Sequence, residues 1–337
     1  MSTAPKRTAV CLERAYIPEL PNFHGGKVRD SYALGDGRHV IIATDRQSAF
    51  DQMLSPVPLK GQVLTRLSSF WFRETASICP NHLIEVPDPN VMIARSLKMI
   101  PLEVVVRAYL TGTTGTSIWM QYESGVREFG GVELPDGLAK NGALPYAVIT
   151  PTSKAPLGQH DVPVGERAIA AAGLCTQQQW ERIKAASLGI FAFGQKICAE
   201  RGIILVDTKY EFGLDGSGAV VLADEVHTPD SSRFWLASSY AARLAAGSEP
   251  EMLDKEYVRL WIKEHCRPYA EPIPPIPEDV RQELSARYVR AFEAITGETI
   301  IAPGKDPLAR IRRNLRRSLP QFFQHGARQA ERPPLIR

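Results

Sequence analysis

Residues 203–226 read IILVDTKYEFGLDGSGAVVLADEV and carry the clearest structural signal in this 337-residue chain. Branched aliphatic side chains fill both halves of the stretch, and three glycines fall between them within residues 213–218. Short apolar runs on either side of a glycine-rich turn are typical of two paired antiparallel strands. The stretch therefore predicts a β-hairpin whose side chains alternate between two faces.

Ionisable side chains share one face of the predicted hairpin. Asp207, Lys209 and Glu211 alternate along the first strand and therefore project to the same side. Asp224 and Glu225 end the second strand, so one of them reaches that side in either register. Converging carboxylates repel one another unless a cation separates them, and an oxygen-liganded Mg²⁺ would serve. A solvated strand face with a surface Lys–Glu pair would give the same pattern, so both explanations stay open.

The rest of the chain predicts a mixture of helices and strands. Strands are expected at residues 27–34, 39–44 and 103–108, and helices at 60–76, 177–201, 256–266 and 277–295. Residues 125–163 are rich in Gly and Pro and are expected to lack regular structure. A stretch of that length without helices or strands is usually functional.

Residues 25–29, GGKVR, are a candidate phosphate-binding segment. Lys27 and Arg29 are two positions apart and hence lie on one face of a strand. The two glycines before them allow another group to approach the backbone closely. A plain turn before a surface strand explains the same residues without any ligand.

Arg107 ends the apolar run 101–106 and precedes residues 111–117, TGTTGTS. A guanidinium beside loop hydroxyls and backbone amides suits a phosphate or a carboxylate, because its fork binds two oxygens at once. Residues 230–233, DSSR, offer the same chemistry. In either segment the hydroxyl or carboxylate side chains could instead cap free backbone N–H groups.

Charge is distributed unevenly along the chain. Residues 304–337 contain nine basic and two acidic side chains, whereas the whole chain has 40 basic and 37 acidic. The remaining body is therefore mildly acidic, and anionic ligands would have to bind through local cations. The Arg-rich end could bind RNA. An amphipathic helix that packs through Leu308, Ile311, Leu315 and Leu319 is the simpler explanation.

Composition excludes several classes of protein. With 44% hydrophobic and 23% charged residues the chain is neither disordered nor collagen-like. No apolar run approaches the roughly 18 residues of a membrane span, and the first ten residues, MSTAPKRTAV, lack the apolar core of a signal peptide. Five cysteines without a Cys-x-x-Cys pair argue against disulfides and structural zinc. We therefore expect reduced thiols in a cytoplasmic protein.

Several ordered segments resemble the SAICAR synthetase family. Residues 99–107 (MIPLEVVVR), 110–113 (LTGT) and 205–213 (LVDTKYEFG) are similar to its two signature segments. Residues 26–30, 43–51, 150–155, 160–161 and 224–233 are similar to further family segments, in the same order. The resemblance runs from about residue 25 to residue 297. Thr113 stands where the family signature has Ser, a change that keeps the hydroxyl.

The resemblance implies a two-lobed α+β fold related to ATP-grasp. A small β-rich lobe is expected at 1–115, a larger α+β lobe at 116–300 and a basic extension at 301–337. The implied activity is that of an ATP-dependent ligase of purine biosynthesis. It would join carboxyaminoimidazole ribonucleotide (CAIR) to L-aspartate through an acyl phosphate, with Mg²⁺, and release SAICAR, ADP and phosphate. Alternatives are another ATP-dependent ligase or small-molecule kinase, and an RNA-binding protein. We expect small-molecule partners and no membrane or nucleic acid, and leave homo-oligomers open.

The resemblance also implies roles for individual residues. ATP would be bound by Lys27, Arg29, Met99, Glu103 and Lys154, and Mg²⁺ by Glu211 and Asp224. The other substrates would contact Arg107, Thr113, Asp230, Ser232, Arg233, Lys255, Ser48 and Asp51. Lys209, Asp207 and Arg233 are the candidate catalytic residues. His160 is either a proton acceptor or a structural residue of its loop.

Overall fold

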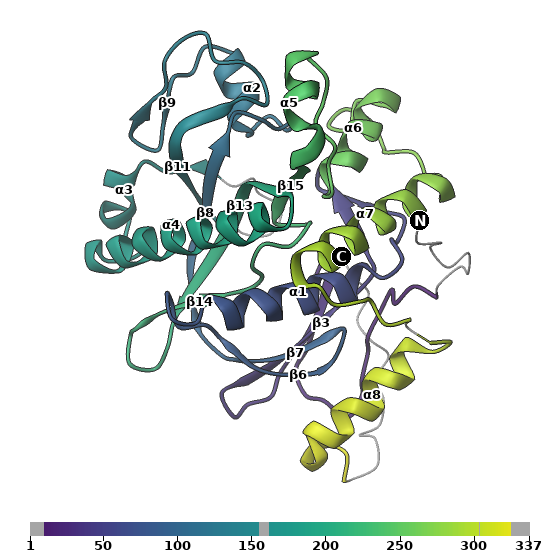
Figure 1. Cartoon of the computed structure of the whole chain (residues 1–337). Helices are drawn as coiled ribbons and strands as arrows, with labels where there is room; N and C mark the ends of the chain where they lie inside the picture. The colour runs from purple at the N-terminus through teal and green to yellow at the C-terminus, as the bar shows by residue number, and fades with distance from the viewer. Residues whose placement is uncertain (1–9, 155–161, 303, 325–337) are drawn as a thin grey trace. The chain divides into compact units, whose positions relative to one another are not determined.

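The computed structural model of the protein describes residues 10–154, 162–302 and 304–324. Helices and strands are mixed along the chain, which confirms the α+β prediction (Figure 1). The chain forms two compact units, the first from residues 1–70, 82–96 and 261–337 and the second from residues 71–81 and 97–260. The predicted segments 1–115, 116–300 and 301–337 are consecutive, so they do not coincide with these interleaved units.

The first unit is built on a five-stranded antiparallel sheet. Its strands, in spatial order, are β1 (Phe23–Gly25), β2 (Arg29–Ala33), β3 (Arg38–Ala43), β7 (Val91–Arg95) and β6 (Leu83–Asp88). A separate short hairpin consists of β4 (Gln47–Ala49) and β5 (Gln52–Leu54). Alternate side chains of the central strands, among them Tyr32, Val40 and Ile93, are buried in one hydrophobic core. The strands predicted at 27–34 and 39–44 are confirmed.

Helices complete the first unit. They are α1 (Lys60–Glu74), which continues into the second unit, α7 (Glu278–Thr296), α8 (Pro307–Ser318) and the 3₁₀ turn η1 (Pro320–Phe322). Helix α7 ends at Gly297, whose left-handed backbone (φ 73°) closes the last turn. The helices predicted at 60–76 and 277–295 are therefore confirmed within two residues at each end.

The described part of the basic C-terminal segment, which ends at residue 324, contains the helix α8 on this unit. Asp306 caps α8 by accepting a hydrogen bond from the backbone of Ala309. Ile311, Leu315 and Leu319 are completely buried in the core of the first unit. The predicted amphipathic packing is thus confirmed, and the basic residues lie on the remaining surface of α8.

The second unit is built on a six-stranded antiparallel sheet. Strands β12 (Val162–Pro163), β11 (Ala143–Ser153), β8 (Lys98–Tyr109), β13 (Ile203–Leu214) and β14 (Val220–Ala223) follow one another, and β15 (Ser232–Leu236) also pairs with β13. The predicted hairpin is β13 with β14, and the strand predicted at 103–108 is the second half of β8. The long central strands β8 and β13 carry six of the candidate site residues, namely Met99, Glu103, Arg107, Asp207, Lys209 and Glu211.

Helices surround this sheet. They are α2 (Ile118–Glu123), α3 (Glu166–Ala171), α4 (Gln177–Glu200), α5 (Ala237–Ala245) and α6 (Glu256–His265), whose last turn belongs to the first unit. Helix α4 packs on β13 and β8 (Figure 1). It begins at a capping box in which Thr176 and Gln179 exchange side-chain and backbone hydrogen bonds. The helices predicted at 177–201 and 256–266 are confirmed.

The expectation that residues 125–163 lack regular structure is wrong for several parts of that segment. The short hairpin of β9 (Glu128–Phe129) and β10 (Val132–Glu133) comes first, and the eleven-residue strand β11 follows. Pro145 and Pro151 lie within β11, and its register with β8 shifts between Ala143 and Val148. Prolines and an irregular register both interrupt the alternation that marks a strand in a sequence.

Two expectations from composition can also be compared with the structure. All five cysteines lie within the described residues as free thiols, as predicted. Over residues 10–154, 162–302 and 304–324, no helix is long and apolar enough to cross a membrane.

Candidate functional site

Strand β13 brings two groups of ionisable side chains together in the second unit. Asp207 lies opposite Arg107 of β8 and Arg233 of β15, and four positions further Glu211 lies opposite Glu103 of β8. Side chains at directly opposed positions of antiparallel strands are close enough to interact. The register of three strands therefore produces one cluster around Asp207 and a second around Glu211.

The lysine–glutamate cluster consists of Glu103, Lys154, Lys209 and Glu211. The Lys209 Nζ lies 2.7 Å from Glu103 Oε1 and 3.0 Å from Glu211 Oε1. The Lys154 Nζ donates to the second oxygen, Glu211 Oε2, at 2.6 Å. Both oxygens of a nearly buried carboxylate thus accept from an ammonium group, so the charge of Glu211 is compensated twice.

The charge state of Lys209 follows from its neighbours. Burial disfavours the ammonium form, but the negative charges of Glu211, Glu103 and Asp224 outweigh burial and raise the pKa of Lys209 above its usual range. Lys209 is therefore a permanent cation at neutral pH. A fixed cation can stabilise a phosphate or an acyl phosphate, but it cannot act as a general base.

Asp224 approaches the lysine–glutamate cluster from the end of β14. Its neighbour Ala223 is paired with Glu211 across the hairpin, so Asp224 immediately follows the position opposite Glu211. The backbone of Asp224 is left-handed (φ 60°), a conformation that is uncommon outside glycine and that Asp tolerates better than most residues. Such local strain is frequent at functional sites.

The carboxylates of this region fit a magnesium ion only in part. Among the described residues, no group of three or more His, Cys, Asp and Glu side chains could hold a metal ion by itself. Mg²⁺ commonly uses one or two carboxylates together with waters and substrate phosphates, and Glu211 and Asp224 offer that donor set. Lys154, with its side chain 48% exposed, occupies one oxygen of Glu211, whose own side chain is only 6% exposed. A cation could therefore replace the exposed ammonium of Lys154 at the buried carboxylate of Glu211.

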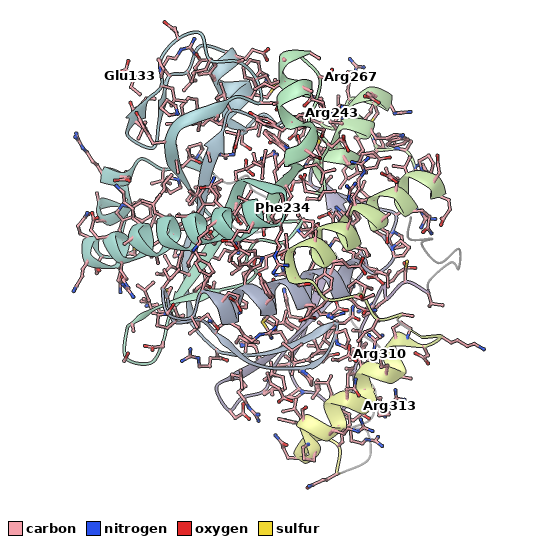
Figure 2. The ribbon with its side chains drawn as sticks, viewed as in Figure 1. Glu133, Phe234, Arg243, Arg267, Arg310 and Arg313 are labelled. Atoms are coloured by element: carbon pink, nitrogen blue, oxygen red, sulfur yellow. The ribbon has the colours of Figure 1, made fainter. Side chains whose placement is uncertain are left out.

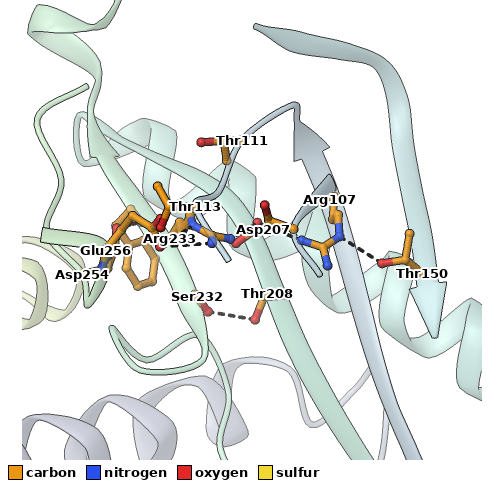
Figure 3. A network of polar contacts seen from close by, with 12 residues as sticks. Arg107, Thr111, Thr113, Thr150, Asp207, Thr208, Ser232, Arg233, Asp254 and Glu256 are labelled. Atoms are coloured by element: carbon orange, nitrogen blue, oxygen red, sulfur yellow. Dashed lines mark hydrogen bonds and ion pairs between the residues drawn. The ribbon is translucent and has the colours of Figure 1, made fainter. Parts of the chain in front are cut away.

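The arginine cluster consists of Arg107, Thr113, Asp207, Arg233 and Glu256. Figure 3 shows Arg107 and Arg233 on either side of Asp207, and their nearest nitrogens lie 3.5 and 2.6 Å from Asp207 Oδ2. Arg233 also reaches Glu256 Oε2 at 3.1 Å, and Thr113 donates its hydroxyl to Glu256 Oε1 at 2.6 Å. The two guanidinium groups are thus held by buried carboxylates.

Burial and charge act differently on the two arginines. Burial lowers the pKa of Arg107 to about 10, although Asp207 partly offsets it. Arg233 is also buried, but Asp207, Glu256 and Asp254 together raise its pKa above the usual value. Of the two arginines, Arg107 is therefore the one whose positive charge is less fully balanced by neighbouring carboxylates. A ligand carboxylate or phosphate would supply the missing negative charge.

The sequence analysis missed Glu256 and Asp254. Burial would raise the pKa of Glu256, but Arg233 and Arg259 outweigh it and hold that pKa at about 2. Burial raises the pKa of Asp254 to about 7, although it accepts hydrogen bonds from the backbone of Phe234 and Glu256. The available signal was the run of residues 254–256, in which two carboxylates flank a lysine at the start of a helix.

Other predicted substrate residues are gathered near the arginine cluster. The Lys255 Nζ lies 3.7 Å from Asp230 Oδ2, which joins two of them. Arg107 donates through its Nε to Thr150 Oγ1 at 2.9 Å, a partner that the sequence analysis did not identify (Figure 3). Ser232 is buried and shares a 2.8 Å hydrogen bond with the hydroxyl of Thr208, so its side chain is already engaged within the sheet.

The remaining predicted residues are divided between the units. Met99 is 45% exposed near the start of β8 in the second unit. Lys27, Arg29, Ser48 and Asp51 belong to the first unit, where the Lys27 Nζ lies 3.0 Å from Asp51 Oδ1. Arg29 begins β2, and Ser48 is the middle residue of β4. His160 lies outside the described residues.

Comparison with known proteins identifies the family. The sequence profile described as SAICAR synthetase matches residues 22–276. Phosphoribosylaminoimidazole-succinocarboxamide synthase of Legionella pneumophila (strain Paris) is 50% identical over 86% of this chain and 92% of its own length. The structure of SAICAR synthase from Saccharomyces cerevisiae complexed with SAICAR is 28% identical, with a TM-score of 0.69 over 89% of this chain and 99% of that one.

A SAICAR synthetase solved in complex with ADP is also similar. It is 25% identical, with a TM-score of 0.64, and the similarity covers 83% of this chain and 100% of that chain. The family profile spans most of the present chain and includes all candidate residues of both clusters. The chain therefore belongs to the SAICAR synthetase family of enzymes.

Proposed function

We propose that the protein joins the carboxylate of CAIR to the amine of L-aspartate and converts ATP to ADP and phosphate. The observation that carries this proposal is the arrangement along β13, where a cluster suited to phosphate and metal adjoins a cluster suited to an anionic substrate. One similar structure is named as a complex with SAICAR and another as a complex with ADP. These names support the binding of a nucleotide and of SAICAR by this chain.

The chemistry explains why ATP is needed. A carboxylate is a poor electrophile at neutral pH, so one of its oxygens first attacks the γ-phosphorus of ATP. The bond from that phosphorus to the β–γ bridging oxygen breaks, and ADP leaves. The amine nitrogen of aspartate then attacks the acyl carbon, phosphate departs with the acyl oxygen, and the amine loses a proton. Most of the catalytic effect comes from alignment and from stabilisation of phosphate charge.

The lysine–glutamate cluster, together with Asp224, would bind the phosphate groups and neutralise their charge. Glu211 and Asp224 would hold Mg²⁺, which neutralises phosphate oxygens when bound. Lys209, whose pKa lies above its usual range beside Glu211 and Glu103, would neutralise the acyl phosphate as a cation. Lys27 and Arg29 of the first unit would face the ATP phosphates, while Lys154, Met99 and Glu103 would lie beside the nucleotide.

The arginine cluster would bind the ribonucleotide. Arg107 and Arg233 present guanidinium groups that fit a phosphate or carboxylate in two-point contacts. Asp207, Asp230 and Lys255 would contact its hydroxyl and amino groups, and Thr113 and Ser232 would complete the pocket. Ser48 and Asp51 of the first unit are proposed to contact substrate without a defined step.

The test is ADP release by the purified protein. We expect release only when ATP, Mg²⁺, CAIR and aspartate are all present, with formation of a product that contains both organic substrates. ADP release with CAIR but without aspartate would indicate a kinase. Release with a different amine acceptor in place of aspartate would indicate another ligase.

RNA binding through the basic C-terminal segment has less support. Two arginines of α8 are engaged within the first unit, because Arg310 pairs with Asp88 at 2.9 Å and Arg312 pairs with Glu19. Figure 2 labels Arg310 and also Arg313, which is exposed. Truncation after Gly304 should therefore destabilise the protein, and it should not abolish ADP release.

A further inference from the structure

Arg46 is a buried guanidinium in the first unit that has no role in the proposed chemistry. It lies between β3 and β4 with a side chain 7% exposed, and it pairs with Asp30, which is completely buried. The Arg46 Nη2 lies 2.8 Å from Asp30 Oδ1, and Nη1 lies 3.3 Å from Oδ2. A buried ion pair of this kind often adds less stability than apolar residues of the same size. Stability alone therefore does not explain why Arg46 and Asp30 are paired here.

The other donors of Arg46 bind backbone carbonyl groups. Nε donates to Lys27 O at 3.0 Å, Nη2 donates to Gly26 O at 2.9 Å, and Nη1 donates to Glu13 O. With the two bonds to Asp30, all five N–H groups of the guanidinium have acceptors. Lysine, which offers three donors from a single nitrogen, could not make the same set of contacts.

These contacts fix the orientation of two successive peptide groups. Within the described residues every peptide bond is trans, and in a trans peptide the N–H points away from the C=O. The carbonyls of Gly26 and Lys27 face Arg46, so the N–H groups of Lys27 and Val28, which belong to the same peptides, face the opposite way. Neither N–H donates to a backbone carbonyl within the described part of the chain.

Neighbouring contacts hold the same turn from its other end. Val28 O accepts from the backbone N–H of Thr44 at 3.1 Å and from its hydroxyl at 2.7 Å. The N–H of Gly26 donates to Arg29 O at 2.8 Å and closes the turn. A Cβ at Gly26 would lie 3.1 Å from that oxygen, so the turn is tight. All three carbonyl groups of residues 26–28 are thus engaged within the first unit, and successive N–H groups of such a turn can bind an anion.

We propose that Arg46, held by Asp30, is a positioning residue that fixes the turn of residues 26–28 so that its backbone N–H groups and Lys27 bind a phosphate group of ATP. The inference rests on the proposed function for the identity of the nucleotide. Arg46 touches no substrate itself. It acts by fixing the peptide groups that do.

The experiment compares Arg46→Lys with the wild-type chain by calorimetric titration with Mg·ADP and by steady-state kinetics. We expect the Kd for Mg·ADP and the KM for ATP to rise about tenfold or more, because small displacements of a binding group have large effects. The KM values for CAIR and aspartate should stay within about twofold of wild type, since their proposed ligands lie elsewhere.

Arg310→Lys is the matched control. Arg310 also forms a buried-carboxylate pair in the first unit, where the contacts described for it are with Asp88 and Asn90. This variant should lower the Tm and leave the Kd for Mg·ADP unchanged. If Arg46→Lys behaves like Arg310→Lys, with a lower Tm and wild-type nucleotide affinity, Arg46 has only a structural role and the inference is wrong.

Thr44→Val provides a second, milder variant should Arg46→Lys not fold. It removes the hydroxyl bond to Val28 O and keeps the backbone bond. A rise of a few fold in the Kd for Mg·ADP supports the inference, and an unchanged Kd overturns it. Calorimetric titration needs no turnover. If the proposed reaction fails, Mg·ADP binding can still be measured for the wild-type chain and compared with binding by the variants. Failure of the proposed function and failure of this inference are therefore distinguishable.

Discussion

The lysine–glutamate cluster and the arginine cluster lie on the same strand but are built differently. In the first, the cations are lysines whose side chains are 29% and 48% exposed, and each contacts carboxylates through a single nitrogen. In the second, Arg233 is 11% exposed and is held from two sides by Asp207 and by Glu256, itself 2% exposed. Lysine is a flexible point charge, whereas arginine is a rigid fork. The lysine–glutamate cluster is therefore suited to exchanging one cation for another at Glu211. The arginine cluster is suited to holding its guanidinium groups in a fixed arrangement.

The largest effect is expected from neutralising the fixed carboxylate of the lysine–glutamate cluster. Glu211→Gln should keep the fold, because Lys209 retains Glu103 as a partner. It should lower kcat by about 10³-fold, because a metal held by one fewer charge stabilises phosphate oxygens by several kcal/mol less. Asp224→Asn should act in the same direction. Both are measured by ADP release across a Mg²⁺ titration.

The control for that prediction is Glu166→Gln. Glu166 of α3 forms an ion pair with Lys184 of α4 at 2.7 Å in the second unit, and neither residue belongs to either cluster. It should retain wild-type turnover. Wild-type rates for Glu211→Gln at low Mg²⁺ would contradict the assignment of Glu211 as a metal ligand.

A smaller and more selective effect is expected in the arginine cluster. Arg107→Lys keeps the charge but removes the fork that contacts Asp207 and Thr150. We expect the KM for CAIR to rise roughly 10- to 100-fold, the range for a lost two-point contact to an anion, and the KM for ATP to change little. Initial rates with each substrate varied in turn give both values. A rise in the KM for ATP instead would place Arg107 beside the nucleotide.

Exchange of cations at Glu211 can be tested by removing its exposed partner. Lys154→Met leaves Glu211 Oε2 open to a metal, since Lys154 donates to that oxygen at 2.6 Å. Because the lysine of this pair is 48% exposed, we take the pair to be worth about 1 kcal/mol, so the Mg²⁺ concentration at half saturation should fall by about two- to fivefold. Lys184→Met removes the corresponding lysine from Glu166 and should leave that concentration unchanged. A higher Mg²⁺ requirement in Lys154→Met would show that the lysine assists the metal.

The two clusters also differ in how much of them could be predicted from the sequence. Alternation along a strand is a local rule, and it correctly placed Asp207, Lys209 and Glu211 on one face of β13. Glu256 contacts Thr113 across 143 residues, a pairing set by how α6 and the loop after β8 pack. No local pattern encodes such a contact. The prolines of β11 likewise concealed the strand that supplies Thr150, because a missing N–H and a shifted register weaken the pattern of a strand.

The smallest effect is expected at Thr113, where the family signature has Ser. Thr113→Ser keeps the hydroxyl that donates to Glu256 Oε1 and removes one methyl group, which is worth at most about 0.8 kcal/mol. The KM for CAIR should therefore change by less than about fivefold. Thr113→Val keeps the shape and removes the donor, so it leaves one oxygen of a buried carboxylate without this partner and should cost more. If Thr113→Ser were as damaging as Thr113→Val, the methyl group rather than the hydroxyl would hold Glu256, and the arginine cluster would depend on packing more than on its hydrogen bonds.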